Sequence, residues 1–228
     1  MRLDKFLSDV TGRSRRESRE IIRSGRLRVN GIIVKLPSYS VSTEDDISLD
    51  GRKLIWRKFT YIKMFKPAGY VSSKREKNLP TIYDLLDHPL KWKLSIAGRL
   101  DRDVEGLVIL TNDGDLIHKI ISPKHRIMKV YDVWMEDELP AESLKMMKRG
   151  FKLKDGYTIL PVEILELEEK KVRIGLFEGK YHLIKRIFHS LNVRISKIRR
   201  IAIGNLKLDE WMKPGDWLEM DELEELIR

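Results

Sequence analysis

The stretch between Ala97 and Asp115 constrains the fold more than any other part of the chain. Its centre, Leu107–Leu110, is an unbroken apolar run that is too short for a helix with these boundaries, so it predicts a fully buried strand. Asn112-Asp113-Gly114 is a turn signal, and a helix is expected to begin near Asp115. The sequence therefore predicts a loop, a buried strand and a tight turn in succession.

Asp101 lies in the loop before this strand, between Arg99 and Arg102. Nearby cations keep a carboxylate ionised, and partial burial strips it of water, so Asp101 is a candidate reactive group. A loop carboxylate that is merely ion-paired to one of the two arginines is the alternative. The tripeptide R-L-D alone would favour that alternative, because short motifs recur by chance.

The charge balance points to a polyanionic partner. Charged residues make up 35% of the 228 residues, above the usual ~25%, and the net charge is +10 with a pI of about 9.6. Nucleic acid is the simplest such partner. A merely basic protein is the alternative, which net charge alone does not exclude. The length allows one large domain or two smaller ones with a proper core.

Several classes of protein are excluded or unsupported. The chain has no cysteine, which rules out disulfides, thiolate chemistry and the usual zinc fingers. A signal-peptide core and a membrane-length apolar run are both lacking, so a cytoplasmic protein is expected. Neither phosphate-binding glycine motif occurs, so a nucleotide cofactor has no support. His182 and His189 lack nearby acidic or thiol partners, and no metal site is expected.

Residues 1–58 are predicted to form a separate basic module. Apolar residues recur at helical spacing near the start, at Leu3, Phe6, Leu7 and Val10. Ser14 and Glu17 form a capping box for a second helix, which Gly25 ends. Asn30-Gly31 is a strong hairpin signal between two short apolar runs. The module is thus expected to hold two helices and a hairpin.

Most of the excess positive charge lies in this module, which has 14 Lys and Arg against 8 Asp and Glu. The second helix carries the arginines Arg15, Arg16, Arg19 and Arg23. Three of them are spaced four residues apart and form one ridge, which suits phosphate contacts because a guanidinium can bind two phosphate oxygens. A solvated helix face is the alternative. With R-x-D-K-F-L at its start and R-V-N-G at its hairpin, the module resembles the S4 RNA-binding domain.

The central stretch also resembles a known signature. Gly98-Arg99-Leu100-Asp101 is followed by G-L-x-x-L-T-N-D-G at residues 106–114. This order resembles the catalytic signature of the pseudouridine synthases of the ribosomal small-subunit (RsuA) type. In that family the Asp of G-R-L-D is the nucleophile, a role that would fall to Asp101. The long ordered match favours this reading over an ion-paired loop carboxylate.

Further family motifs follow in the expected order. Residues 66–69 match a K-P-x-G loop, and Lys129-Val130-Tyr131 matches a K-x-Y strand whose Tyr packs against the target base. A half-buried strand aromatic is the alternative for Tyr131. Residues 178–186 resemble E-G-x-x-H-Q-V-K-R, in which the basic residue at the position of Lys185 pairs with the catalytic Asp. Arg186, beside it, is the alternative for this pairing, but it is rather expected to touch RNA.

The last motif, R-x-x-I-G-x-L at residues 200–206, makes Ile203 the expected apolar wall of the base pocket. Two positions depart from the family pattern: Val104 replaces a small hydroxyl residue, and Leu183 replaces the Gln of H-Q-V. Neither carries the implied chemistry, but both would lose hydrogen bonds that position the loop and the helix.

The resemblance implies conversion of a uridine to pseudouridine in ribosomal RNA without a cofactor. The target base must be flipped out of its stack, and Arg99 would fill the vacated space and hold phosphates. The leading alternative is a catalytically inactive S4-domain RNA-binding or ribosome-assembly protein. A hydrolase using Asp101 and Asp103 ranks below it, because side chains two residues apart on an extended loop point to opposite sides.

The expected architecture is α+β. A small S4-like α/β module, residues 1–58, precedes a catalytic domain, residues 59–228, with a mixed, mainly antiparallel sheet flanked by helices. Further strands are expected at 61–65, 129–134, 151–162 and 164–177. Helices are expected at 140–150, within 178–188 after a glycine turn, and in the acidic tail. Asp101, Tyr131, Lys185 and Ile203 should converge across the sheet. A monomer acting on ribosomal RNA or a ribosome-assembly intermediate, with no membrane partner, is expected.

Overall fold

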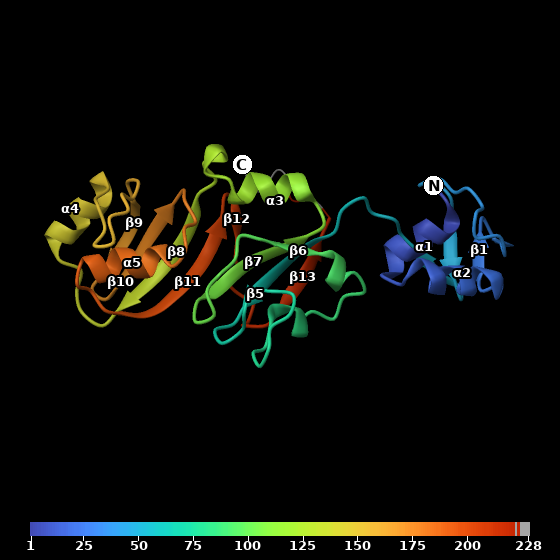
Figure 1. Ribbon diagram of the computed structural model, residues 1–228, viewed down its shortest axis with the longest axis horizontal. Helices are drawn as coiled ribbons and strands as arrows, with labels where there is room; N and C mark the ends of the chain where they lie inside the picture. Colours follow the sequence, from blue (N-terminus) through green and yellow to red (C-terminus); the bar gives the residue numbers. More distant parts are fainter. Residues whose placement is uncertain (222, 224–228) are drawn as a thin grey trace. The chain divides into compact units, whose positions relative to one another are not determined.

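The computed structural model describes residues 1–221 and 223. The chain divides into two compact units (Figure 1). The first consists of Met1–Thr60 and Leu86–Leu94, and the second of Tyr61–Leu85 and Ser95–Arg228. The chain thus returns once to the first unit after the second has begun.

The first unit is a small α/β module. Its helices are α1 (Leu3–Thr11), α2 (Arg15–Arg23) and the short η2 (Lys91–Lys93), and its strands are β1 (Leu27–Val29), β2 (Ile32–Ile33), β3 (Ile47–Leu49) and β4 (Arg52–Leu54). The strands form an antiparallel sheet in the order β2-β1-β3-β4. Apolar residues from both helices and the sheet make one core, with Leu3, Phe6, Leu7, Ile22, Leu27 and Ile47 among its members.

The local signals of this module are confirmed. Ser14 caps α2 and forms the expected capping box with Glu17. Gly25 follows the helix with φ +76°, the left-handed conformation in which glycine ends helices without a Cβ clash. Asn30 and Gly31 both have positive φ, 50° and 80°, as a tight hairpin turn between β1 and β2 requires.

The second unit is built on one large sheet. Its strands run in the order β13-β5-β7-β11-β8-β10-β9, with β12 beside β11 and β6 beside β7. Only β7 and β11 pair in parallel among the described strands, so the predicted mixed, mainly antiparallel sheet is confirmed. The strands are β5 (Tyr61–Lys66), β6 (Ser95–Ala97), β7 (Glu105–Thr111), β8 (Lys129–Met135), β9 (Glu163–Glu168), β10 (Lys171–Leu176), β11 (Ile195–Ile203), β12 (Leu206–Lys207) and β13 (Trp217–Met220).

Helices join these strands and pack beside them (Figure 1). They are α3 (Gly114–Ile121), α4 (Ala141–Arg149) and α5 (Leu183–Ser190), with short turns η1 (Ile82–Asp84) and η3 (Pro123–His125). The turn signal before α3 acts as predicted, because the Asp113 carboxylate accepts a hydrogen bond from Leu116 N and caps the helix.

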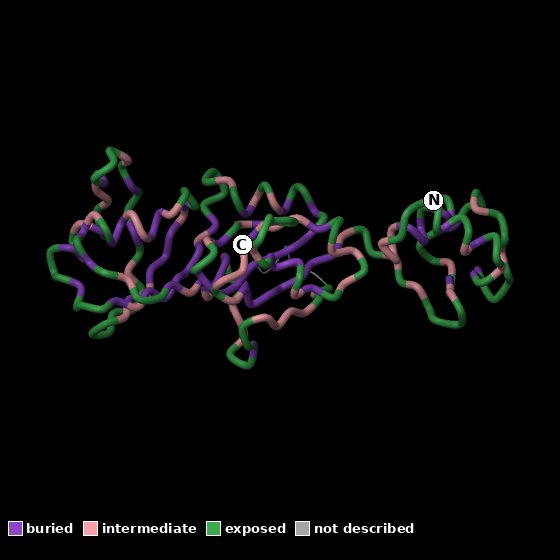
Figure 2. Tube along the Cα trace, turned by 60° about the horizontal axis from the view of Figure 1, so that its bottom comes forward, coloured by how far each residue is buried: buried purple, intermediate pink, exposed green. Residues whose placement is uncertain are grey.

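The strand β7 lies at the centre of this unit. All seven of its residues are buried, as the apolar run predicted, and buried positions follow the strands in Figure 2. Gly106 has φ +116°, and a Cβ there would stand 2.2 Å from the main-chain oxygen of Arg200. Glycine at this position therefore allows β11 to run beside β7.

The expected secondary structure has to be revised in two segments, residues 151–162 and the C-terminal segment. Residues 151–162 were expected to be a strand, but they form a loop with a single bridge between Lys152 and Thr158; Gly156, at φ +90°, turns the chain there. Residues 217–220 form β13 against β5. The expected helix in the acidic tail falls largely on residues 222 and 224–228, which lie outside the described residues.

None of the described helices has the length and apolar character needed to cross a membrane.

The close approach at Gly106 gives a test of the fold. Gly106→Ala should lower the free energy of unfolding by about 3 kcal/mol or more, because the added Cβ meets main-chain atoms and φ is positive. Gly114→Ala is the matched control: nothing lies within 4 Å of its Cβ position, and alanine favours a helix. Urea denaturation measures both, and equal stabilities would contradict the packing described.

Candidate active site

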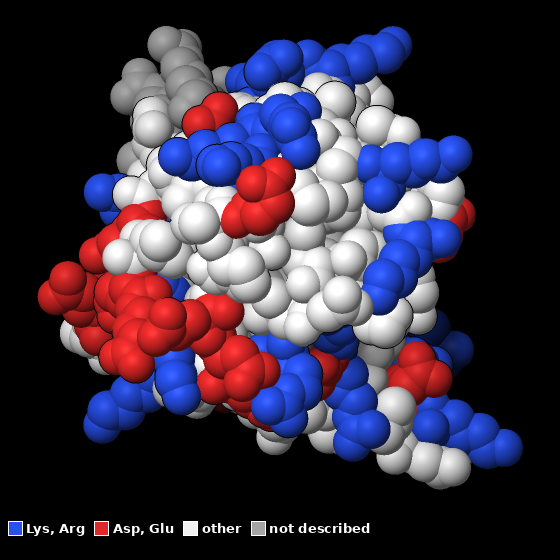
Figure 3. Space-filling view, turned by 90° about the vertical axis from the view of Figure 1, so that its left-hand side faces the viewer, with Lys and Arg blue, Asp and Glu red and all other residues white. Residues whose placement is uncertain are grey.

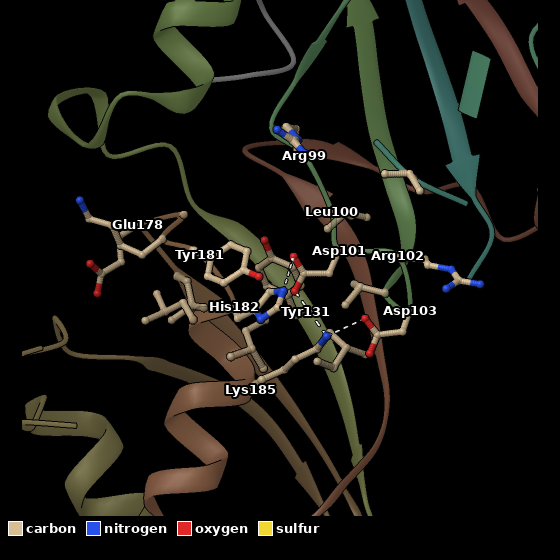
Figure 4. Close-up of a pocket in the computed structure, with 18 residues that line it drawn as sticks. Arg99, Leu100, Asp101, Arg102, Asp103, Tyr131, Glu178, Tyr181, His182 and Lys185 are labelled. Carbon is tan, nitrogen blue, oxygen red and sulfur yellow. Dashed lines mark hydrogen bonds and ion pairs between the residues drawn. The ribbon is translucent and has the colours of Figure 1, made fainter. Parts of the chain in front are cut away.

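A cavity of about 630 Å³ opens beside the loop that precedes β7 (Figure 4). Residues 99–104 form one wall, and the segment from Glu178 to Lys185 forms another. Tyr131 of β8 and Ile198 of β11 contribute from the sheet. The cavity thus lies between the stretch that organises the fold and the N-terminal end of α5.

Asp101 faces a lysine and a histidine across this cavity. Its side chain is 28% exposed, and its Oδ2 lies 3.5 Å from Lys185 Nζ. Its Oδ1 lies 3.5 Å from Nε2 of His182. Figure 4 shows both side chains pointing at Asp101 from the opposite wall. The structure therefore brings together Asp101 and Lys185, which lie 84 positions apart in the sequence.

Asp103 also binds Lys185, with Oδ1 only 2.6 Å from Nζ. The expectation that Asp101 and Asp103 point to opposite sides is wrong, because this loop is not extended: Val104 N bonds to Asp101 O, and a turn brings both carboxylates to Lys185. Burial acts to raise the pKa of Asp103, but the hydrogen bond and charge of Lys185, together with a backbone hydrogen bond, outweigh burial and hold that pKa below its usual value. Asp103 is therefore a poor proton donor, which still disfavours the paired-carboxylate hydrolase.

A buried lysine holds the loop that carries Asp101 in place. Lys66 has no exposed surface, and its ammonium group donates to the carbonyls of Pro67, Arg102 and Val104 at 3.0, 3.2 and 2.6 Å. Three carbonyls use all three protons of the ammonium group. Burial lowers the pKa of Lys66 to about 8.

A buried arginine holds the two ends of the same segment. Arg200 of β11 is 2% exposed and donates to Gly98 O at 2.6 Å and to Leu107 O at 2.8 Å. The carbonyls before and after the Asp101 loop are thus tied to one guanidinium. Sequence reasoning placed Lys66 and Arg200 in motifs but missed these roles, because carbonyl partners depend on the folded backbone.

The remaining expected cavity residues are placed unequally. Tyr131 is buried and lines the cavity, and Arg99 lies at its edge (Figure 4). Ile203 is fully buried and is not among the lining residues; Ile198 of the same strand is. Arg186 turns to Asp155, 2.6 Å away, rather than into the cavity.

Two lining residues were not anticipated as part of this site. Tyr181 is 78% exposed, and its ring stacks on that of His182 with centroids 3.7 Å apart. His182 has a left-handed backbone with φ +50°, which directs the chain into α5. The sequence showed His182 within a motif but not that its imidazole would reach Asp101.

The arginine ridge of the first unit has an internal partner. Asp4 is fully buried and accepts hydrogen bonds from Arg2, Arg15 and Arg19. Burial acts to raise the pKa of Asp4, but the three guanidinium groups outweigh burial and hold that pKa far below its usual value. Arg16 pairs with Glu20, and Arg23 is exposed.

Two family models match the chain. Residues 1–47 match the S4 domain, and residues 60–190 match RNA pseudouridylate synthase. The chain belongs to the RNA pseudouridylate synthase family. The second match includes the Asp101 loop, Tyr131 and Lys185, and of the residues that line the cavity only Ile198 lies outside it.

Relatives within the synthase family match over nearly the whole chain. Ribosomal small subunit pseudouridine synthase A of Vibrio parahaemolyticus is 38% identical, with 95% of this chain and 94% of that protein covered. The protein of the same name from Escherichia coli is 35% identical with 98% of each covered. A crystal structure of a pseudouridylate synthase is 36% identical, covers 96% of each chain and has a TM-score of 0.68.

The anchored loop gives a pH prediction. Between pH 8 and 10.5 the folded synthase releases the Lys66 proton that the unfolded chain keeps, so the free energy of unfolding rises with pH over this range. Lys66→Met should lack this rise. As the pH rises, the free energy of unfolding of wild type should therefore increase relative to that of Lys66→Met by up to about 1.4 kcal/mol per pH unit. Urea denaturation at pH 7.5 and 9.5 measures it, and parallel pH profiles would contradict the assignment.

Proposed function

We propose that this synthase converts a uridine of small-subunit ribosomal RNA to pseudouridine, with Asp101 as the nucleophile. The observation that supports it most is Asp101 at 3.5 Å from Lys185 inside the cavity of the matched domain. The target class follows from the relatives named ribosomal small subunit pseudouridine synthase A.

The reaction is an isomerisation. The bond between C1′ and N1 of the uridine breaks, the uracil turns, and a bond forms between C1′ and C5. The hydrogen of C5 leaves and N1 gains a proton, so atoms and electrons balance without a redox partner. A carboxylate near C1′ and C6 can act as nucleophile, and the uridine must be flipped into the cavity first.

Each neighbour of Asp101 has a proposed part. Lys185 aims the carboxylate, because its ammonium group lies 3.5 Å from Oδ2 of Asp101. Tyr131 offers a flat face for the flipped base. Arg99 at the cavity edge takes the vacated space in the RNA, and Ile198 walls the base pocket in place of the buried Ile203.

RNA contacts outside the cavity are proposed from the charge distribution. Residues 1–58 act as the RNA-binding module and 59–228 as the catalytic domain. Arg15, Arg16, Arg19 and Arg23 present charge on α2, and Arg186 adds charge next to the cavity. Figure 3 shows acidic side chains gathered on one side at the α4 end of the second unit; phosphates are repelled there. We place the activity in the cytoplasm and expect a monomer.

The nucleophile is tested by Asp101→Asn. The variant should lose release of tritium from 5-tritiated uridine in small-subunit transcripts by about a thousandfold or more, because the amide cannot attack. RNA affinity should change little. An active Asp101→Asn would remove Asp101 from this role. A wild type that releases no tritium from transcripts or partly assembled particles would favour the inactive RNA-binding protein.

Lys185 and Arg186 form a matched pair for the same assay. Lys185→Met should reduce the single-turnover rate by about a hundredfold, since it removes the cation at Asp101. Arg186→Met removes an equal charge one residue away, where the partner is Asp155, and the rate should stay within a few-fold of wild type. The reverse order of effects would transfer the positioning role to Arg186.

The arginine ridge is tested by salt dependence. Arg23→Gln should reduce the slope of log K against log salt by about one, as the loss of one phosphate contact does. Arg23 is preferable to Arg15 or Arg19, because replacing either of those would also remove an ion-pair partner of the buried Asp4 and destabilise the module. Lys53→Gln, on β4 and paired with Asp46, is the control and should leave the slope unchanged. Equal slopes for both variants would count against the ridge.

A further inference from the structure

A second cavity, of about 240 Å³, lies in the catalytic unit next to the start of β8. Its polar lining comes from Lys119, His125, Arg126 and Asn205, and its apolar part from Ile127 and Met128. No acidic side chain is among the described residues that line it. The cavity therefore carries only positive or neutral hydrogen-bonding groups.

The walls of this cavity are fixed to one another. Lys129, which is 7% exposed, donates from Nζ to Ile120 O in the last turn of α3 and to Ile127 O, each at 2.7 Å. Gly204 N donates to Met128 O at 2.7 Å and so ties the turn between β11 and β12 to the same segment. Three separate elements are thus held around the cavity by buried hydrogen bonds, as a preformed binding site requires.

The cavity is close to the active site along the chain and through one side-chain contact. Met128 lines it, and Tyr131, three residues further, lines the active site, which corresponds to about 10 Å along a strand. The Arg126 guanidinium lies over the ring of Phe177, 5.0 Å from its centroid. The two neighbours of Phe177, Leu176 and Glu178, line the active site. A few nucleotides of RNA can span this separation.

The lining chemistry matches one nucleotide. Lys119 and Arg126 supply the cations that bind phosphate oxygens. The imidazole of His125 offers a face on which an unstacked base can lie, and the Asn205 amide offers both a donor and an acceptor to a base edge. We propose that this cavity binds a nucleotide of the substrate RNA that flanks the flipped uridine. The proposal rests on the proposed function for its substrate but concerns a separate set of residues.

The test uses a series of short RNAs around the modified uridine, lengthened one nucleotide at a time on each side. With the wild-type synthase, affinity should increase about tenfold at the length that reaches the cavity. Lys119→Gln and Arg126→Gln should each abolish that increment. The single-turnover rate at saturating RNA should stay unchanged, because neither residue lines the active site.

Lys124→Gln is the matched control. Lys124 is an exposed lysine in η3, next to His125, and does not line the cavity. Its substitution should leave the length-dependent increment intact. An excess of free uridine monophosphate should not displace the RNA, since the affinity comes from a tethered nucleotide.

Three results would overturn the proposal. One is an equal loss for Lys124→Gln and Lys119→Gln, which would indicate a general charge effect. Another is an increment that survives in both cavity variants. The third is displacement of RNA by free nucleotide, which would indicate a small-molecule site. Because binding is measured apart from turnover, failure of the isomerisation itself leaves these results readable.

Discussion

The structure depends on buried cations that bind main-chain carbonyls instead of carboxylates. Arg200 of β11 binds the carbonyls of Gly98 and Leu107. Lys66 binds the carbonyls of Arg102 and Val104 in the loop between them. A buried charge is costly unless hydrogen bonds replace those it made with water. These carbonyls must therefore keep their positions so that the buried cations keep their hydrogen bonds. The hydrogen bonds that let the core tolerate these charges also hold the loop that carries Asp101 in place.

This anchoring determines the electrostatics of the cavity. The turn that Lys66 stabilises sends both Asp101 and Asp103 toward Lys185, which is closer to Asp103. Asp103 therefore shares the cation and places negative charge beside Asp101. His182, braced by the ring of Tyr181, supplies a second contact to Asp101. The arrangement keeps the Asp101 carboxylate within reach of Lys185 and His182 while one side faces the cavity.

Local signals in the sequence predicted local structure well. The capping box at Ser14, the hairpin at Asn30 and the buried run of β7 depend on neighbouring residues, and all are confirmed. The motifs also placed Lys185 at Asp101, which no periodicity could show. The burial of Ile203 and the pairing of Lys185 with Asp103 escaped prediction. These depend on strand register and on a turn between Asp101 and Val104, which form only when distant strands pair.

The most direct measurement compares RNA affinity with the single-turnover rate in Arg200→Lys. Arg200 bonds the two carbonyls through different nitrogens, Nε to Leu107 O and Nη2 to Gly98 O, and the single ammonium of a shorter lysine does not supply donors at both of those positions. We expect a folded variant whose affinity for small-subunit transcripts stays within about twofold and whose rate at saturating RNA falls by about ten- to a hundredfold. A folded variant with the wild-type rate would contradict the claim that anchored carbonyls position Asp101.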